Sequence, residues 1–157
     1  DSPHFPAVDS AKDRVTQYNL MLDHFQPEIA RIVQAVADAP AGGVLFHCHA
    51  GKDRTGIAAA LLLGLAGVPD EAIAADYAIS EERLWPLYYR LEAEAEAHND
   101  EDALAFIRRQ KPICTPETMQ RVLAHLGERY GGVEGYLLTA GLAADTLARI
   151  RRRLIQE

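Results

Sequence analysis

The chain has 157 residues, a net charge of −7, 48% hydrophobic residues and 25% charged residues. These values fit one globular domain with a sizeable core, and the negative charge argues against general nucleic-acid binding. Its two cysteines are too few for a disulfide framework. No apolar run approaches the roughly 20 residues that cross a bilayer, so we expect no transmembrane segment. The oligomeric state stays unknown from composition.

The first part of the chain is predicted to be helical. We expect one or two helices over residues 12–25 and 27–39, with Pro27 at the start of the second. The second helix carries apolar residues on one face, namely Ile29, Ile32, Val33 and Val36. Gly42-Gly43 then breaks the helical pattern.

A short strand and a long helix are predicted on either side of the next loop. Residues 44–47 are mostly apolar with a β-branched start, which predicts a buried strand, and residues 55–66 have helical apolar spacing. A loop between a strand end and a helix start points its backbone N–H groups into the loop, and the helix dipole adds partial positive charge. We therefore expect an anion in this loop.

The loop also holds reactive side chains. Cys48 stands at its first position, where the thiol pKa falls to roughly 3.5–7.5 beside cations or a helix N-terminus. Arg54 can hold two phosphate oxygens with its planar fork, and Thr55 can donate its hydroxyl to the thiolate. Gly51 and Gly56 permit close approach of the backbone. The pattern predicts a cysteine nucleophile acting on a phosphate group.

Helical segments are predicted for most of the remaining chain. We expect helices over 70–78, from Ser80 to about residue 97, from Asn99 or Asp100 to residue 109, and over 117–130, 133–139 and 143–155. Cys114, just before the Thr115-Pro116 helix start, is expected to be structural.

The stretch from His47 to Gly56, HCHAGKDRTG, resembles the Cys-x5-Arg signature of cysteine-dependent protein tyrosine phosphatases. It is most similar to the form found in the bacterial tyrosine/serine phosphatase family. The resemblance implies an α/β, protein tyrosine phosphatase-like fold with this phosphate-binding loop (P-loop) between a central strand and a helix. It also implies phosphate monoester hydrolysis without metal or cofactor. The substrate is expected to be a phosphorylated protein or a phosphoinositide.

The resemblance extends beyond the P-loop. Asp76-Tyr77-x-x-Ser80 resembles the family's D-Y-x-x-S element, and the segment from Tyr130 to Leu142 is similar to its closing region. The strands that open the family pattern do not appear, so residues 1–157 are expected to be the helix-rich C-terminal portion of a single phosphatase domain. Residues 81–110 are expected to form a helical lid or an ordinary packing helix pair.

The resemblance implies specific roles for the P-loop residues. Cys48, Arg54 and Asp53 are the expected catalytic residues, and the expected substrate-binding residues are His49, Ala50, Gly51, Lys52, Thr55 and Gly56. Lys52 could bind a second phosphate of an inositol lipid or the carboxylate of an acidic peptide. The alternative for Lys52 is a solvated charge.

The general acid stays open at this point. The family usually supplies an Asp from a separate loop upstream, which here means Asp1, Asp9 or Asp13. The rival is Asp53 inside the P-loop, whose neighbours Lys52 and Arg54 favour an ion-pair role over an acid role.

Other functions fit the motif less well. A metal cluster at His47, Cys48 and His49 is disfavoured because adjacent strand residues point to opposite faces. His47 is then expected to be buried and hydrogen-bonded to the loop backbone. A Walker A loop would need Ser or Thr where Asp53 stands. A rhodanese-type loop lacks the Lys-Asp-Arg-Thr-Gly sequence of residues 52–56. The rival of another class is a phosphate-recognition module without turnover. The cytoplasm is the default compartment, and secretion stays open.

Overall fold

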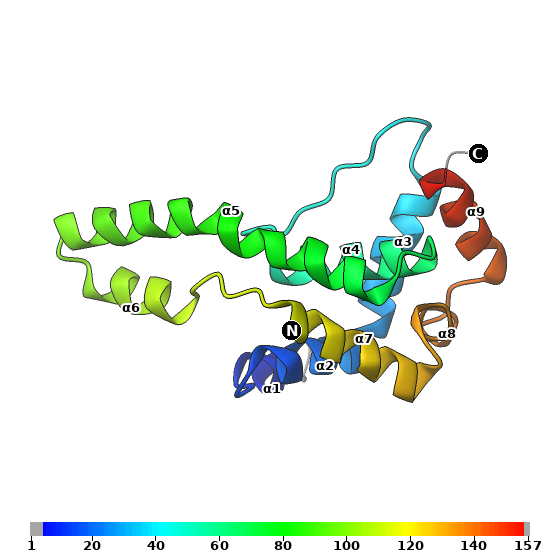
Figure 1. Cartoon of the computed structure of the whole chain (residues 1–157), viewed down its shortest axis with the longest axis horizontal. Helices are drawn as coiled ribbons and strands as arrows, with labels where there is room; N and C mark the ends of the chain where they lie inside the picture. Colours follow the sequence, from blue (N-terminus) through cyan, green and yellow to red (C-terminus); the bar gives the residue numbers. More distant parts are fainter. Residues whose placement is uncertain (1–4, 156–157) are drawn as a thin grey trace.

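The structure is a computed structural model that describes residues 5–155 (Figure 1). All regular secondary structure in these residues is helical. The helices are α1 (Phe5–Asp9), α2 (Arg14–His24), α3 (Gln26–Asp38), α4 (Asp53–Leu65), α5 (Asp70–Ala97), α6 (Glu101–Arg109), α7 (Pro116–Tyr130), α8 (Val133–Thr139) and α9 (Ala144–Leu154).

Helix α4 is the centre of the core. It contacts α3, α5, α8 and α9, and most of its side chains are buried, namely Ile57, Ala58, Ala60, Leu61, Leu62 and Leu65. A helix that is apolar on nearly all sides has to be covered on all sides, which explains its central place. Because the P-loop leads directly into α4, the surrounding helices hold the P-loop through this helix.

Two helix starts are capped by aspartate side chains, and the sequence predicted the second of them. Asp13 accepts a hydrogen bond from the Thr16 amide at the start of α2, and Asp100 accepts one from Ala103 at the start of α6. Such side-chain oxygens satisfy amides that have no partner inside the helix. Helix α7 begins at Pro116, as the sequence predicted within one residue.

The strand predicted over residues 44–47 is not confirmed in the described part of the chain. The segment between α3 and α4 carries no strand. Leu45 is 91% exposed and Val44 37%, whereas Phe46 is half-buried against the core. A strand needs a neighbour to accept its backbone hydrogen bonds, and residues 5–155 supply none. The α/β class is therefore not confirmed here. In Figure 1 the segment loops out from the end of α3 before it returns to the start of α4.

Helix α5 joins two helices that the sequence predicted separately. It continues from Asp70 to Ala97, and Ser80 lies in its interior instead of capping a new helix. No Gly or Pro stands around Ser80 to break the helix, and the Pro86 farther along is accommodated inside it. With α6, the second half of α5 forms a hairpin that projects from the helical body (Figure 1).

Candidate active site

The P-loop turns sharply before α4 begins. Gly51 has a φ of +68°, a left-handed conformation that favours glycine. The amide of Gly56 then donates to the carbonyl oxygen of Lys52 at 2.8 Å, which closes the first turn of α4. The turn brings loop and first-turn amides toward Cys48, as expected for a loop that holds an anion.

Cys48 lies half-buried in this arrangement of donors. Burial raises the pKa of its thiol, but hydrogen bonds from the hydroxyl and amide of Thr55 and from the amides of Lys52 and Gly51 outweigh burial and lower the pKa to about 6. The Thr55 hydroxyl is buried and has no hydrogen-bond partner by distance and angle among the described residues, so it is free to donate to the thiolate. Cys48 is therefore largely a thiolate at neutral pH, which is the nucleophilic form.

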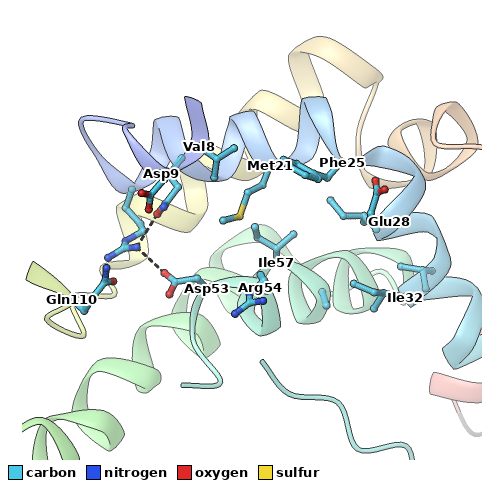
Figure 2. Close-up of a pocket in the computed structure, with 15 residues that line it drawn as sticks. Val8, Asp9, Met21, Phe25, Glu28, Ile32, Asp53, Arg54, Ile57 and Gln110 are labelled. Carbon is cyan, nitrogen blue, oxygen red and sulfur yellow. Dashed lines mark hydrogen bonds and ion pairs between the residues drawn. The ribbon is translucent and has the colours of Figure 1, made fainter. Parts of the chain in front are cut away.

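Arg54 is exposed beside a pocket of about 350 Å³. Apolar side chains of α2, α3 and α4 form most of the pocket wall, and Arg14, Gln17, Asp53 and Arg54 line its polar side. In Figure 2, Asp53 faces α2, whereas Arg54 points away from it. The guanidinium is thus placed to bind an anion from outside the protein.

Asp53 is held by side chains of other elements. Its Oδ1 accepts from the Tyr18 hydroxyl at 2.6 Å and lies 3.1 Å from Nη1 of Arg14, and its Oδ2 lies 3.8 Å from Nζ of Lys52. Both Tyr18 and Arg14 belong to α2. The carboxylate is therefore directed toward α2 and ties the P-loop to that helix.

Lys52 is buried, with only 1% of its surface exposed. Its ammonium donates to the carbonyl oxygens of Gln110 (3.5 Å) and Lys111 (3.3 Å), in the segment that joins α6 to α7. Burial lowers the pKa of Lys52. The solvated charge considered from the sequence is therefore wrong, and the ammonium connects the P-loop to the base of the hairpin.

The candidate general acids lie in different settings. Asp9 is exposed at the end of α1 and lines the same pocket as Arg54. Asp13 caps α2 and accepts from both the amide and the hydroxyl of Thr16. Asp1 lies outside the described residues.

The histidines of the P-loop are on the surface. His47 is exposed, so the prediction of a buried side chain is wrong, because the segment before it does not pack into a sheet. Its Nδ1 lies 2.8 Å from the Cys48 carbonyl oxygen, which confirms the predicted hydrogen bond to the loop backbone. His49 is exposed and Ala50 is half-buried.

The other side of the P-loop faces α5. Gly51, Thr55 and Gly56 line a small pocket of about 110 Å³ with side chains that include the D-Y-x-x-S residues Asp76, Tyr77 and Ser80. The hydroxyl of Tyr77 lies 2.9 Å from that of Tyr18. The sequence reasoning missed Tyr18 and Arg14, and no motif around them in α2 could have indicated their contacts with Asp53.

Two further observations concern only residues 5–155. No group of three or more His, Cys, Asp or Glu side chains is placed to hold a metal ion. No helix in this range combines the length and the apolar character needed to cross a membrane.

Comparisons with known proteins show which family the chain belongs to. The profile of the tyrosine phosphatase family matches residues 4–156. The chain is 38% identical over 149 residues to a tyrosine-protein phosphatase of Nostoc commune, covering 88% of the chain and 48% of that protein. It is 32% identical over 120 residues to the triple specificity protein phosphatase PtpB of Mycobacterium tuberculosis, covering 71% of the chain and 44% of PtpB. The chain thus spans about half the length of these curated relatives. It belongs to the tyrosine phosphatase family.

Proposed function

We propose that this chain carries the nucleophile of a cysteine-dependent protein phosphatase that hydrolyses phosphate monoesters, phosphotyrosine foremost. The observation that carries the proposal is the position of Cys48, whose thiol pKa of about 6 results from P-loop donors. Those donors suit an anion, and a thiolate among them is ready to attack phosphorus.

The reaction proceeds in two steps. The Sγ of Cys48 attacks the phosphorus in line with the ester oxygen, so that a P–S bond forms as the P–O bond breaks and the leaving oxygen takes a proton from a general acid. Arg54 and the P-loop amides bind the equatorial oxygens. Water then breaks the P–S bond, releasing inorganic phosphate and the thiolate, and its proton passes to the conjugate base of the acid. The chemistry needs neither metal nor cofactor.

Asp9 is our candidate for the general acid. It is exposed in the pocket that Arg54 lines, where a substrate oxygen could reach it. Asp53 instead has both oxygens near donors of the protein, which supports a positioning role. Asp9→Asn should then remove the basic limb of the pH–rate profile for substrates with poor leaving groups.

The substrate-binding part of the site is the P-loop itself. We assign contacts with the phosphate to His49, Ala50, Gly51, Thr55 and Gly56. Lys52 is assigned to holding the P-loop, because its ammonium is buried against backbone carbonyl oxygens. The relative named a triple specificity phosphatase makes phosphoserine, phosphothreonine or phosphoinositide a second substrate class to test alongside phosphotyrosine.

We also propose that the hairpin over residues 81–110 is a helical lid on a single phosphatase domain. Its support is the contact of Lys52 with the segment that follows α6. The α/β fold is also proposed. Val44, Leu45 and Phe46 have the composition of a strand, and Val44 and Leu45 are exposed where another strand can pair. Slow amide exchange at Val44, Leu45 and Phe46 would support the pairing, and fast exchange would contradict it.

The experiment is hydrolysis of a small aryl phosphate by the wild-type chain and by Cys48→Ser, with chelator present throughout. We expect turnover that chelator does not change and that Cys48→Ser abolishes. A folded wild-type chain that binds phosphate without turnover would favour the phosphate-recognition module instead. Activity that survives in Cys48→Ser would contradict the proposed nucleophile.

A further inference from the structure

A chain of buried hydroxyl groups leads from the core to the P-loop. Tyr18 is fully buried, and its Oη lies 2.6 Å from Oδ1 of Asp53 and 2.9 Å from Oη of Tyr77. Tyr77 in turn contacts the thiol of Cys114. The four residues come from α2, α4, α5 and the segment before α7, so the chain joins separate parts of the fold at the start of α4.

The direction of the hydrogen bonds follows from the carboxylate. The Tyr18 hydroxyl donates to the Asp53 carboxylate, and the Tyr18 oxygen is left to accept from Tyr77. Burial raises the pKa of Tyr18 and of Tyr77 well above the ordinary tyrosine value, so both keep their protons. A donor to a charged acceptor inside a protein makes one of the stronger hydrogen bonds.

Tyr18 differs from Arg14 in its burial and from Lys52 in its shorter distance to Asp53. Arg14 has 25% of its side chain exposed, where water screens the ion pair, and the ammonium of Lys52 is farther away at 3.8 Å. The hydrogen bond from Tyr18 is shorter, at 2.6 Å, and the Tyr18 side chain is fully buried, so water does not screen it.

We propose that Tyr18 is a positioning residue of the P-loop, which holds Asp53 in place at the first residue of α4 and thereby aligns the amides of Lys52 and Thr55 with Cys48. The inference rests on the proposed function, because it assigns Tyr18 to the same reaction. It does not place Tyr18 in contact with substrate. Its expected effect is on the properties of Cys48, transmitted through Asp53.

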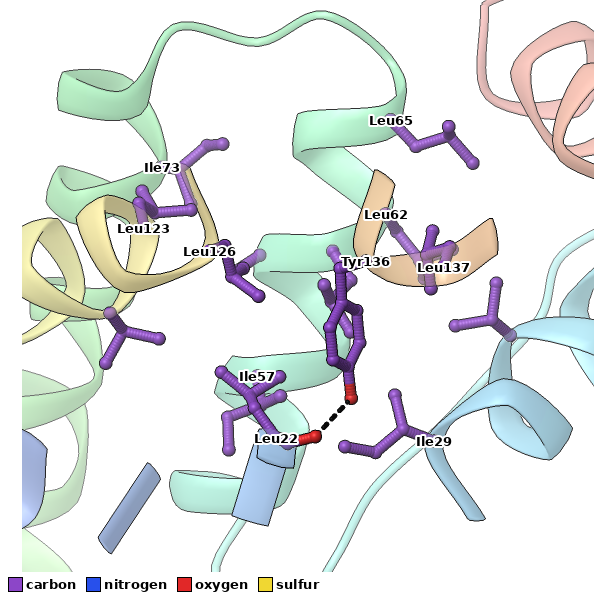
Figure 3. Packing of buried hydrophobic residues seen from close by; sticks show 14 of the residues in the cluster. Leu22, Ile29, Ile57, Leu62, Leu65, Ile73, Leu123, Leu126, Tyr136 and Leu137 are labelled. Carbon is purple, nitrogen blue, oxygen red and sulfur yellow. Dashed lines mark hydrogen bonds between the residues drawn. The ribbon is translucent and has the colours of Figure 1, made fainter. Parts of the chain in front are cut away.

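A matched control exists in the same core. Tyr136 of α8 is also fully buried, and its hydroxyl donates to the carbonyl oxygen of Leu22 at 3.0 Å (Figure 3). Tyr136→Phe therefore removes a buried, hydrogen-bonded hydroxyl, as Tyr18→Phe does, but without a contact to the P-loop. A purely structural role for Tyr18 would make the two variants behave alike.

The experiment measures the pKa of Cys48 from the pH dependence of its alkylation by iodoacetamide. Peptide mass mapping separates Cys48 from Cys114. We expect Tyr18→Phe to raise the pKa of Cys48, Tyr77→Phe to raise it less, and Tyr136→Phe to leave it unchanged despite a comparable loss of thermal stability. A Tyr18→Phe chain with the wild-type Cys48 pKa, or an equal change in Tyr136→Phe, would overturn the proposal.

A double-mutant cycle tests the route through Asp53. We expect Tyr18→Phe to slow aryl phosphate hydrolysis about tenfold, and to add little further loss in an Asp53→Asn background. If Tyr18→Phe slows hydrolysis as much in the Asp53→Asn background as in the wild-type chain, the route through Asp53 is overturned. The alkylation result does not depend on turnover, so an inactive wild-type chain would overturn the proposed function alone. If turnover depends on Cys48 but Tyr18→Phe and Tyr136→Phe hydrolyse the aryl phosphate at the same rate, the inference alone is overturned.

Discussion

Gly56 of α4 lies so close to Tyr77 of α5 that a Cβ atom on Gly56 would be 2.9 Å from Cδ2 of the tyrosine ring. The contact is in the first turn of α4, directly after the P-loop. It brings Tyr77 near enough for its hydroxyl to reach Tyr18. The glycine that ends the P-loop motif therefore sets the distance between α4 and α5.

Substituting Gly56 should disturb this packing. We expect Gly56→Ala to lower the free energy of unfolding by about 1–3 kcal/mol, since the added methyl group displaces the Tyr77 ring. Gly127→Ala in α7 is the control, because a Cβ there meets no atom within 4 Å. It should raise stability by about 0.5–1 kcal/mol. Denaturant unfolding of both variants checks this, and equal effects would contradict it.

Thr55 is expected to control the acidity of Cys48. Its hydroxyl and amide both stabilise the thiolate, so Thr55→Ala removes one hydrogen bond to the charged form and should raise the Cys48 pKa from about 6. The reactive fraction at mildly acidic pH then falls, while alkylation at high pH is unchanged. Thr55→Ser keeps the hydroxyl and should keep the pKa. A Thr55→Ala chain with an unchanged alkylation profile would contradict this role.

Asp23 should make stability depend on pH. It accepts from Tyr130 Oη at 2.6 Å and from His125 Nε2 at 2.9 Å. Burial raises its pKa, but these two hydrogen bonds prevail and lower the pKa below 3.8. A carboxyl group whose pKa is lowered by folding stabilises the protein above its unfolded pKa, and this stability is lost as the pH falls through the folded pKa.

The Asp23→Asn variant tests this linkage. At neutral pH we expect it to lower the free energy of unfolding by about 1–3 kcal/mol, and the difference from wild type should shrink in acid. Asp145→Asn is the control: its side chain is 81% exposed and its ion pair with Arg149 is 3.5 Å long. It should change stability by less than about 0.5 kcal/mol. A pH-independent loss in Asp23→Asn would contradict the linkage.

Lys52→Met distinguishes a positioning lysine from a substrate contact. Removing the ammonium frees the carbonyl oxygens of Gln110 and Lys111, so amide exchange in the segment between α6 and α7 should become faster. Hydrolysis of a phosphotyrosine peptide and of a phosphoinositide should fall by the same factor. Lys111→Met, at an exposed position of the same segment, should change neither. A loss confined to the phosphoinositide would instead assign Lys52 to a second phosphate.

The sequence predicted the parts of the site that are local in the chain. Cys48, the glycine turn at Gly51 and the start of α4 follow from residues within one loop, and caps such as Asp100 act over three positions. The contact between Tyr18 and Asp53 spans 35 positions and depends on how α2 and α4 pack. No periodicity or motif in α2 carries that information.

Long-range packing also explains where the structure departs from the local sequence patterns. The strand expected around Leu45 needs a partner strand, so its local apolar pattern was not sufficient. A lysine on a loop is normally solvated, yet Lys52 finds backbone acceptors from a segment that approaches only in the folded chain. In α5, helical continuity across Ser80 prevailed over its capping propensity.

The most direct test of the central claim is to trap the phosphoenzyme. The wild-type chain is mixed with a radiolabelled aryl phosphate, quenched rapidly in acid and digested, and the labelled peptide is sequenced. We predict a label on Cys48 through sulfur, absent from Cys48→Ser. Turnover with the label on another residue, or with no covalent intermediate at any quench time, would contradict the assignment of Cys48 as the nucleophile.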